Sequence, residues 1–142
     1  MTGLGADELC GGYGRHRTAY ERGGYESVKD VLALEVARLW ERNLMRDDRC
    51  VGGNGVELRF PFLDERVVQC VQNMDITDVV DFERPQGEGD KMVLRKLAEE
   101  LGGKEGAGRI KRAMQFGTRI VKGEKGRKTP EEGLNGVAEG EE

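Results

Sequence analysis

The sequence predicts a mainly helical protein, because two segments carry the spacing of a buried helical face and strand signals are scarce. Residues 28–44 and 91–101 both place apolar side chains at the i, i+3, i+4 positions of one face. A free-standing α/β domain would instead alternate strand and helix patterns along the chain. The chain is therefore either the helical half of a larger unit, whose sheet lies elsewhere, or a small independent helical domain.

The N-terminal half begins with a glycine-rich stretch and continues into the first of these helices. Residues 3–14 have glycines at both ends of a short helix-compatible stretch that starts at Ala6. A polar segment, residues 15–26, follows it, and Ser27 stands where an N-cap is expected. The apolar face of the helix, which we expect to be buried, consists of Val28, Val31, Leu32, Val36, Leu39, Trp40 and Leu44.

The C-terminal half contains a proline-interrupted apolar segment and two further helices. Pro61 predicts an extended or turn conformation within residues 60–63, whose apolar side chains we expect in the core. Asp64 stands at the N-cap position of a short helix that runs to about residue 74. Residues 75–90 are expected to form a loop. The helix over residues 91–101 should end at the glycine pair 102–103.

Composition limits the classes of protein that this chain fits. Its 142 residues suffice for one small domain, with 37% hydrophobic residues and a net charge of −4. Residues 122–142 are rich in glycine and acidic residues, so we expect a disordered tail there and a partial domain over residues 1–121. Residues 131–142 carry five glutamates and no Lys or Arg, and without them the chain is nearly neutral, which argues against nucleic-acid and membrane-surface partners. Three scattered cysteines predict reduced thiols, and with no apparent signal or membrane segment we expect a cytoplasmic protein.

The segment from Thr2 to Glu8 is where chemistry is most plausible. Glycines at positions 3 and 5 let backbone amides approach a ligand closely, and a helix that starts at Ala6 directs its N–H groups at an anion. The carboxylates of Asp7 and Glu8 are suitable oxygen ligands for Mg²⁺. Taken alone, this pattern fits a metal–phosphate site, and it equally fits a glycine-rich turn with a capping aspartate.

Four motifs together resemble the synthetase domain of the asparagine synthetase family. In order they are T-G-L-G-A-D-E-L-C-G-G-Y from Thr2, R-D-D-R-C-V-G-G-N-G-V-E-L-R-F-P-F-L-D from Arg46, K-M-V-L-R-K-L-A from Lys91 and K-R-A-M-Q-F-G from Lys111. The details G-Y-G-R-H-R and K-R-A-M-Q-F-G are most similar to the asparagine synthetase domain-containing proteins. The resemblance covers about residues 1–121.

The resemblance implies a fold, a reaction and a set of site residues. The chain would be the helical C-terminal part of an α/β adenine-nucleotide α-hydrolase-like (ATP-pyrophosphatase) domain. Members of this family use ATP to adenylylate the side chain of aspartate, release pyrophosphate, and let ammonia displace AMP to give asparagine. By this resemblance Thr2, Gly3 and Gly5 would line the nucleotide and pyrophosphate site, and Asp7 would bind Mg²⁺. Lys111 would be the catalytic lysine that stabilises charge on the departing pyrophosphate.

The sequence also departs from the family pattern in three ways. It contains no Ser-Gly-Gly-x-Asp-Ser loop, which is the family's primary ATP-binding element, and no glutaminase domain with its N-terminal cysteine. Leu4 stands where asparagine synthetases carry a glutamate, and an aliphatic side chain can neither accept a proton nor bind a metal. Two hypotheses follow. The chain is a partial synthetase domain that works with a complementary chain carrying the missing loop, or it is a non-catalytic remnant that serves as an interaction or folding module.

Overall fold

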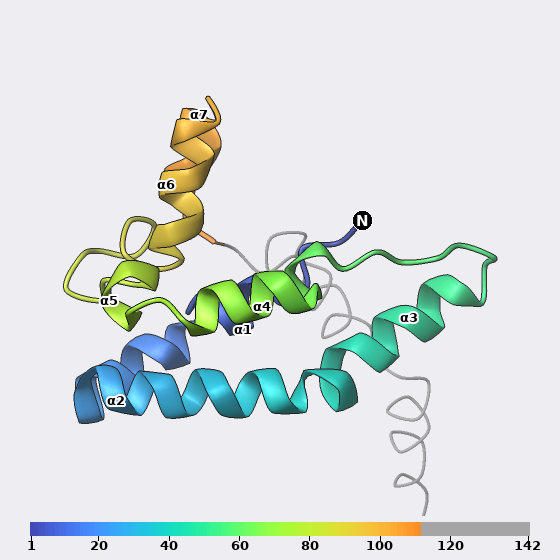
Figure 1. The fold of residues 1–142 in the computed structure, drawn as a ribbon, viewed down its shortest axis with the longest axis horizontal. Coiled ribbons are helices and arrows are strands. Elements are labelled where there is room, and N and C mark those ends of the chain that lie inside the picture. Colours follow the sequence, from blue (N-terminus) through green and yellow to red (C-terminus); the bar gives the residue numbers. More distant parts are fainter. Residues whose placement is uncertain (112–142) are drawn as a thin grey trace, which may run out of the picture. The chain divides into compact units, whose positions relative to one another are not determined.

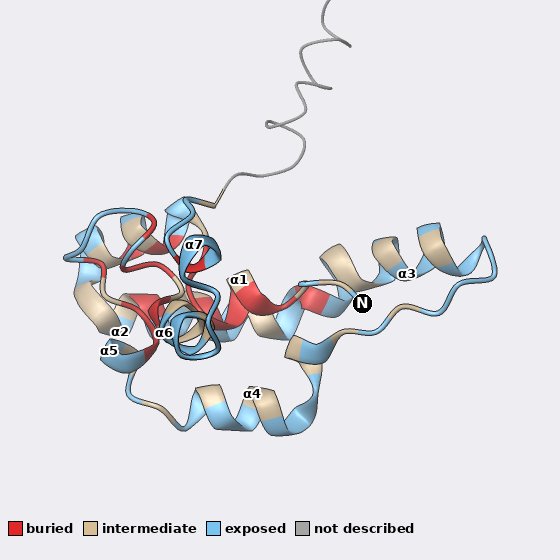
Figure 2. Ribbon diagram, turned by 90° about the horizontal axis from the view of Figure 1, so that it is seen from above, coloured by how far each residue is buried: buried red, intermediate tan, exposed pale blue. Residues whose placement is uncertain are grey.

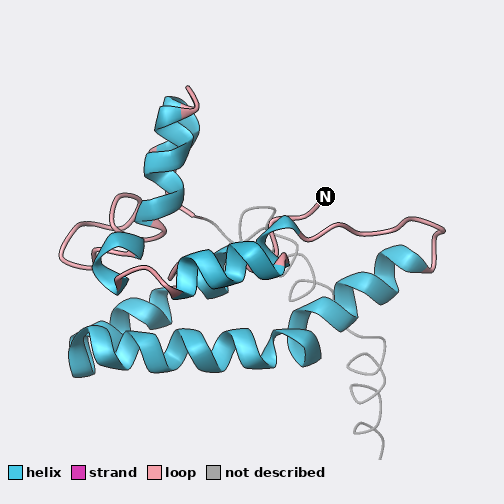
Figure 3. Cartoon of the chain, in the orientation of Figure 1, coloured by secondary structure: helices cyan, strands magenta, loops and turns pink. Residues whose placement is uncertain are grey.

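The computed structural model describes residues 1–111, and these residues form helices and turns without a strand (Figure 1, Figure 3). This confirms the prediction of a mainly helical chain. Residues 1–110 form one compact unit, and Lys111 begins a second unit whose remaining residues are not described. The predicted tail over residues 122–142 and the predicted domain end at residue 121 lie outside the described residues.

The N-terminal helices are α1 (Ala6–Leu9) and α2 (Gly14–Leu39). Helix α1 begins at Ala6, as predicted. Helix α2 begins earlier than predicted, because residues 14–22 are helical and not a polar connection. Ser27 lies inside the helical stretch that resumes after Gly24, so it is not an N-cap. The backbone leaves the helical conformation at Gly23 and at Gly24, whose φ is +63°, and the helix kinks there. The kink allows the early part of α2 to bury Ala19 in the same core as the later part.

Helix α2 continues without a break through a π-helical turn, η1 (Trp40–Leu44), into α3 (Met45–Gly52). Val28, Leu32 and Leu39 of the predicted apolar face are buried, but the side chain of Trp40 is 55% exposed. The prediction that Trp40 lies in the core was therefore wrong. Trp40 directly follows the buried Leu39, and successive helical residues point about 100° apart, so the two side chains do not share the buried face.

The remaining helices are η2 (Pro61–Leu63, a 3₁₀ turn), α4 (Glu65–Gln72), α5 (Ile76–Val79), α6 (Met92–Glu100) and α7 (Lys104–Ala107). Asp64 caps α4 as predicted, since its carboxylate accepts a hydrogen bond from the Arg66 N–H at 3.0 Å. Helix α5 lies within the predicted loop over residues 75–90, which corrects that prediction. Helix α6 ends before Gly102, as predicted.

The hydrophobic core surrounds α1 and the turn after α5 (Figure 2). Helix α1 contacts both α2 and α4, and α2 also contacts α5. The core consists of Leu9, Cys10, Ala19, Val28, Leu32, Val79, Val80 and Phe82. The apolar side chains of residues 60–63 are only half-buried or exposed, so the prediction that they belong to the core holds in part. Among residues 1–111, no helix combines the length and the apolar composition that crossing a membrane requires.

Candidate functional site

The loop from Thr2 to Gly5 leads directly into α1 and is held in place by one local hydrogen bond and one to a distant part of the chain. The Thr2 N–H donates to the Arg59 carbonyl at 3.0 Å, and the Thr2 hydroxyl accepts from the Leu4 N–H at 3.3 Å. Gly5, with φ of +96°, is buried, and a side chain there would overlap Leu63. Gly5 is therefore required by the turn and by packing. Gly3 is exposed, with open space where a side chain would point.

Asp7 projects from the first turn of α1 and meets a lysine that the sequence reasoning missed. Its Oδ1 atom lies 3.0 Å from the Nζ atom of Lys91, and the two side chains are 21% and 22% exposed. Gly12 lies so close that a methyl group on it would overlap the Asp7 carboxylate. A glycine at this position therefore makes room for the Asp7 Oδ1 atom, which is itself buried although both side chains are partly exposed.

Lys91 has an unusual backbone. It is the N-cap of α6 and, with φ of +53°, the only residue other than glycine with positive φ among residues 1–111. This left-handed conformation costs about 1–2 kcal/mol for a residue with a side chain. Its N–H donates to the Cys10 carbonyl at 3.1 Å, so backbone and side chain both tie Lys91 to the α1 region. A cation at a helix N-terminus opposes the helix dipole, and this was the sequence signal that could have identified Lys91.

Glu8 faces away from Asp7 and has a structural role. Its side chain is buried at 3% exposure, and its Oε1 atom accepts hydrogen bonds from the Tyr13 hydroxyl at 2.7 Å and the Asn43 amide at 3.0 Å. Burial and the bond to Glu8 raise the pKa of Tyr13. Adjacent helical residues do not share a face. The structure therefore does not bring Glu8 together with Asp7 as a second carboxylate.

A buried histidine supports the start of α2. His16 is fully buried, and its Nδ1 atom accepts a hydrogen bond from the Tyr13 N–H at 3.3 Å. The Nε2 atom therefore carries a proton and donates to Glu35 at 2.9 Å. Burial opposes ionisation of Glu35, but the hydrogen bonds from His16 and Arg15 outweigh it and hold the pKa of this carboxyl below its usual value. The network fixes the turn that follows α1.

A second ion pair immediately precedes Lys91. Asp90, with a side chain 7% exposed, pairs with Arg95 at 2.8 Å and accepts a hydrogen bond from the Gly87 N–H at 2.5 Å. Arg95 also donates to the carbonyl oxygens of Ala107 and, at 2.9 Å, Arg109. This guanidinium thereby holds α6 to the segment that leads toward Lys111. We call these contacts the Arg95 clamp.

The predicted site residues are thus only partly brought together. Thr2, Gly3, Gly5 and Asp7 share one loop and the first turn of α1. Lys111 lies in the second unit, whose position relative to residues 1–110 is not described, so its catalytic role stays a prediction. Within residues 1–111 no group of three or more potential metal ligands occurs. Mg²⁺ commonly binds only one or two protein carboxylates, and waters and phosphates supply its other ligands. The partly exposed Asp7 could therefore be the only ligand that these residues contribute.

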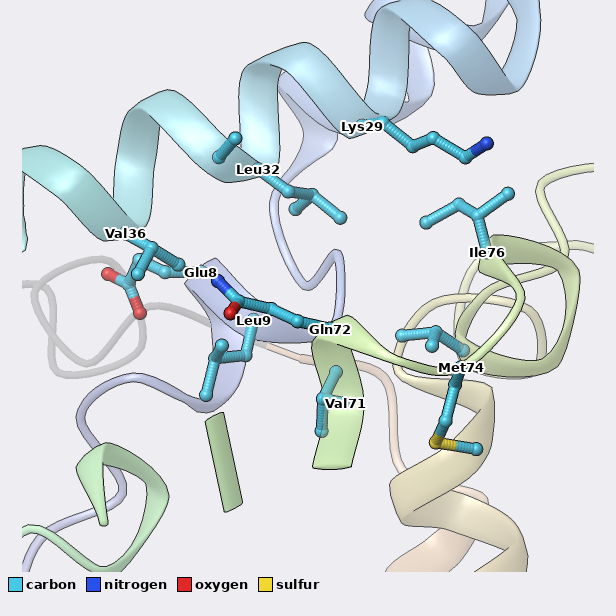
Figure 4. Close-up of a pocket in the computed structure, with 11 residues that line it drawn as sticks. Glu8, Leu9, Lys29, Leu32, Val36, Val71, Gln72, Met74 and Ile76 are labelled. Atoms are coloured by element: carbon cyan, nitrogen blue, oxygen red, sulfur yellow. The ribbon is translucent and has the colours of Figure 1, made fainter. Parts of the chain in front are cut away.

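A separate apolar groove lies between α1, α2, α4 and α5 (Figure 4). Its volume is about 250 Å³. Lys29 stands at one end of the groove in the close-up, and Glu8 and Gln72 stand further along it. The apolar lining residues are Leu9, Leu32, Ala33, Val36, Val71, Met74, Ile76 and Val79. An apolar groove open to solvent is typical of a surface that contacts another polypeptide segment.

Comparisons with known proteins point to the same family as the four sequence motifs. Residues 20–135 match the sequence profile of the asparagine synthase family. The chain is 47% identical over 125 residues to asparagine synthetase domain-containing protein 1 of Mus musculus, covering 88% of this chain and 20% of that protein. It is 38% identical over 127 residues to an asparagine synthetase domain-containing protein of Drosophila melanogaster, covering 85% of this chain and 22% of that protein. The chain spans about a fifth of the length of these relatives. No solved structure matches it.

Proposed function

This chain belongs to the asparagine synthase family, and we propose that residues 2–7 form one wall of a site for ATP-dependent amidation of aspartate. The observation that carries the proposal is the Asp7–Lys91 pair beside a glycine-rich loop, in which a partly exposed carboxylate and a cation lie 3.0 Å apart. Metal–nucleotide chemistry requires both kinds of charge in one place. The other wall would come from a segment with the Ser-Gly-Gly-x-Asp-Ser loop.

The proposal gives the residues of this wall separate tasks, and it assigns one to Lys111 from the family resemblance alone. The open space at Gly3 would admit the nucleotide close to the backbone, while Gly5 and the Thr2 hydroxyl hold the loop in shape. Asp7 would bind Mg²⁺, which when bound supplies positive charge to the phosphates. Lys111 would stabilise the charge that builds up on the departing pyrophosphate. Leu4 offers no proton acceptor, so we expect the step that uses a glutamate in asparagine synthetases to be slowed or lost.

Reconstitution tests this function. The chain is mixed with a complementary chain that carries the Ser-Gly-Gly-x-Asp-Ser loop, and aspartate-dependent pyrophosphate release and ATP binding are measured. Asp7→Ala and Lys111→Ala should abolish release, and Asp7→Ala should also weaken binding of ATP with Mg²⁺. Matched controls are Asp30→Ala and Lys96→Ala, which change exposed residues of α2 and α6 outside the loop. If the mixture shows neither pyrophosphate release nor ATP binding, the proposal is refuted. ATP binding without release would point to the loss of the glutamate at Leu4.

The apolar groove favours a second candidate function, an interaction module without catalysis. Its occupant would be the sheet-bearing segment that the family domain implies, since an α/β domain needs a sheet and the described residues contain none. Ala33 lines the groove and is exposed, whereas Ala37 is exposed on the same helix but does not line it. Ala33→Arg should therefore prevent binding of the complementary chain, and Ala37→Arg should not. Equal binding by both variants would contradict this role.

A further inference from the structure

We propose that Lys91 is a built-in counter-ion of Asp7 that makes metal binding at this site depend on a phosphate-bearing ligand. The inference rests on the proposed function, because it takes Asp7 to be the metal-binding carboxylate. Nothing in the family resemblance assigned a role to Lys91. The structure singles it out by its contact with Asp7 Oδ1 at 3.0 Å and by its left-handed backbone.

The position of Lys91 is fixed from three sides. Its N–H donates to the Cys10 carbonyl at 3.1 Å, which ties it to the end of α1. The preceding residue, Asp90, is held by Arg95 at 2.8 Å and by the Gly87 N–H at 2.5 Å. The following residue, Met92, is buried at the start of α6. A strained backbone persists only where its surroundings over-determine it, and here the strained residue aims an ammonium group at Asp7.

Competition between two cations follows from this placement. The Lys91 ammonium contacts Oδ1, which is buried, so a metal ion would have to reach Asp7 through the other oxygen of the same carboxylate, and Mg²⁺ must approach that ligand oxygen to about 2.0–2.1 Å. A divalent ion on Asp7 would then lie next to the positively charged Lys91 ammonium. If the ammonium moved away, it would give up its contact with the Asp7 carboxylate. Free metal alone should therefore bind weakly.

A phosphate-bearing ligand changes this balance. The negative oxygens of a pyrophosphate or triphosphate group offer the displaced ammonium a new partner, so Lys91 can leave Asp7 without losing its counter-charge. Metal and anion then favour each other's binding, and the coupling must be equal in both directions. Lys91 thus acts as a positioning residue that reserves Asp7 for a metal–phosphate complex. Both side chains are about one-fifth exposed, although the Asp7 Oδ1 atom that the ammonium contacts is buried.

The test measures two affinities with the same variants of the chain at low ionic strength. Mn²⁺ binding is followed by electron paramagnetic resonance, and binding of inorganic pyrophosphate at fixed Mn²⁺ is followed by calorimetry with a protein-free titration subtracted. Lys91→Asn removes the charge while keeping a residue that tolerates positive φ, and Lys91→Gly repeats the test without a side chain. Lys91→Arg keeps the charge. Circular dichroism establishes that each variant is folded.

The two affinities should change in opposite directions. Lys91→Asn should bind Mn²⁺ alone about tenfold more tightly, because a like charge beside the metal is gone. The same variant should bind pyrophosphate about tenfold more weakly, because a charge-assisted contact is lost. Lys91→Arg should stay close to the wild type in both. A variant that had only damaged the fold would weaken both affinities together.

Asp7→Asn separates this inference from the proposed function. If Asp7→Asn abolishes Mn²⁺ binding but Lys91→Asn leaves it unchanged or weaker, the counter-ion role is wrong and the metal-binding role of Asp7 stands. If Asp7→Asn binds Mn²⁺ like the wild type, the metal site itself is wrong and both proposals fail. Absence of Mn²⁺ binding in the wild type and in Lys91→Asn, even with pyrophosphate, would also overturn both.

Discussion

Replacing Arg95 with methionine should destabilise the protein more than any surface ion-pair change, because the Arg95 clamp is largely buried. The Arg95 and Asp90 side chains are 12% and 7% exposed. Methionine keeps much of the side-chain volume but removes the guanidinium, so the Asp90 carboxylate would lose its cationic partner. The carbonyl oxygens of Ala107 and Arg109 would lose their donors as well.

The expected loss is about 3 kcal/mol in the free energy of unfolding. Removing one partner of a buried ion pair typically costs ~3–5 kcal/mol, and the Gly87 N–H still contacts Asp90 in the variant, which places the loss at the lower end. Small domains have a total stability of ~5–15 kcal/mol. Each kcal/mol lowers Tm by about 4 °C for a body of this size, so Tm should fall by about 12 °C.

Urea unfolding followed by circular dichroism at 222 nm measures this loss. Arg66→Met is the matched control, since the Arg66 side chain is 90% exposed in its pair with Asp64 and the change should leave stability almost unaltered. In a double-mutant cycle, Asp90→Asn and Arg95→Met together should cost about 1–3 kcal/mol less than the sum of the single changes. Trypsin should also cleave after Arg109 faster in Arg95→Met, because the carbonyl at that bond is no longer held.

The same pair predicts a pH dependence. Burial opposes ionisation of Asp90, but the Gly87 N–H and Arg95 outweigh it and hold the pKa of this carboxyl below its usual value. A group whose pKa is lower in the folded state stabilises the fold fully above its unfolded pKa of about 3.9 and loses this contribution as pH falls through the folded pKa. The stability difference between wild type and Asp90→Asn should therefore shrink below about pH 4.

The unfolding experiment can also contradict the reasoning. An Arg95→Met variant no less stable than Arg66→Met, or an additive double-mutant cycle, would refute the stabilising role of the Arg95 clamp.

Two further predictions concern the surroundings of Asp7. Gly12→Ala should destabilise the fold and break the Asp7–Lys91 ion pair, because the added methyl group would overlap the Asp7 carboxylate. Gly14→Ala should be tolerated, because a methyl group there meets open space. Thermal melts compare the stability of the two variants. Burial raises the pKa of the Cys10 thiol to about 12, so a thiol reagent at pH 8 should modify the two exposed cysteines rapidly and Cys10 only after unfolding. Rapid modification of all three in the native state would contradict the buried position of Cys10.

The positions of the helices were predictable where the signal was local. The start of α1 at Ala6, the Asp64 cap of α4 and the end of α6 before Gly102 depend on residues within one or two turns of each other. Predictions failed where packing outweighed local preference. Residues 15–22 are polar enough to resemble a connection, yet they are helical and place Ala19 in the core.

The sequence alone determined the helical character of the chain and, through four ordered motifs, its resemblance to a nucleotide-using family. Both depend on patterns that are visible along the chain, namely periodicity, caps and motif order. Only the tertiary structure decided which charges meet. Asp7 and Lys91 are far apart in sequence, and their contact requires α1, the space left by Gly12 and a left-handed backbone at the start of α6. Glu8, adjacent to Asp7 in sequence, faces another direction because successive helical side chains do not share a face.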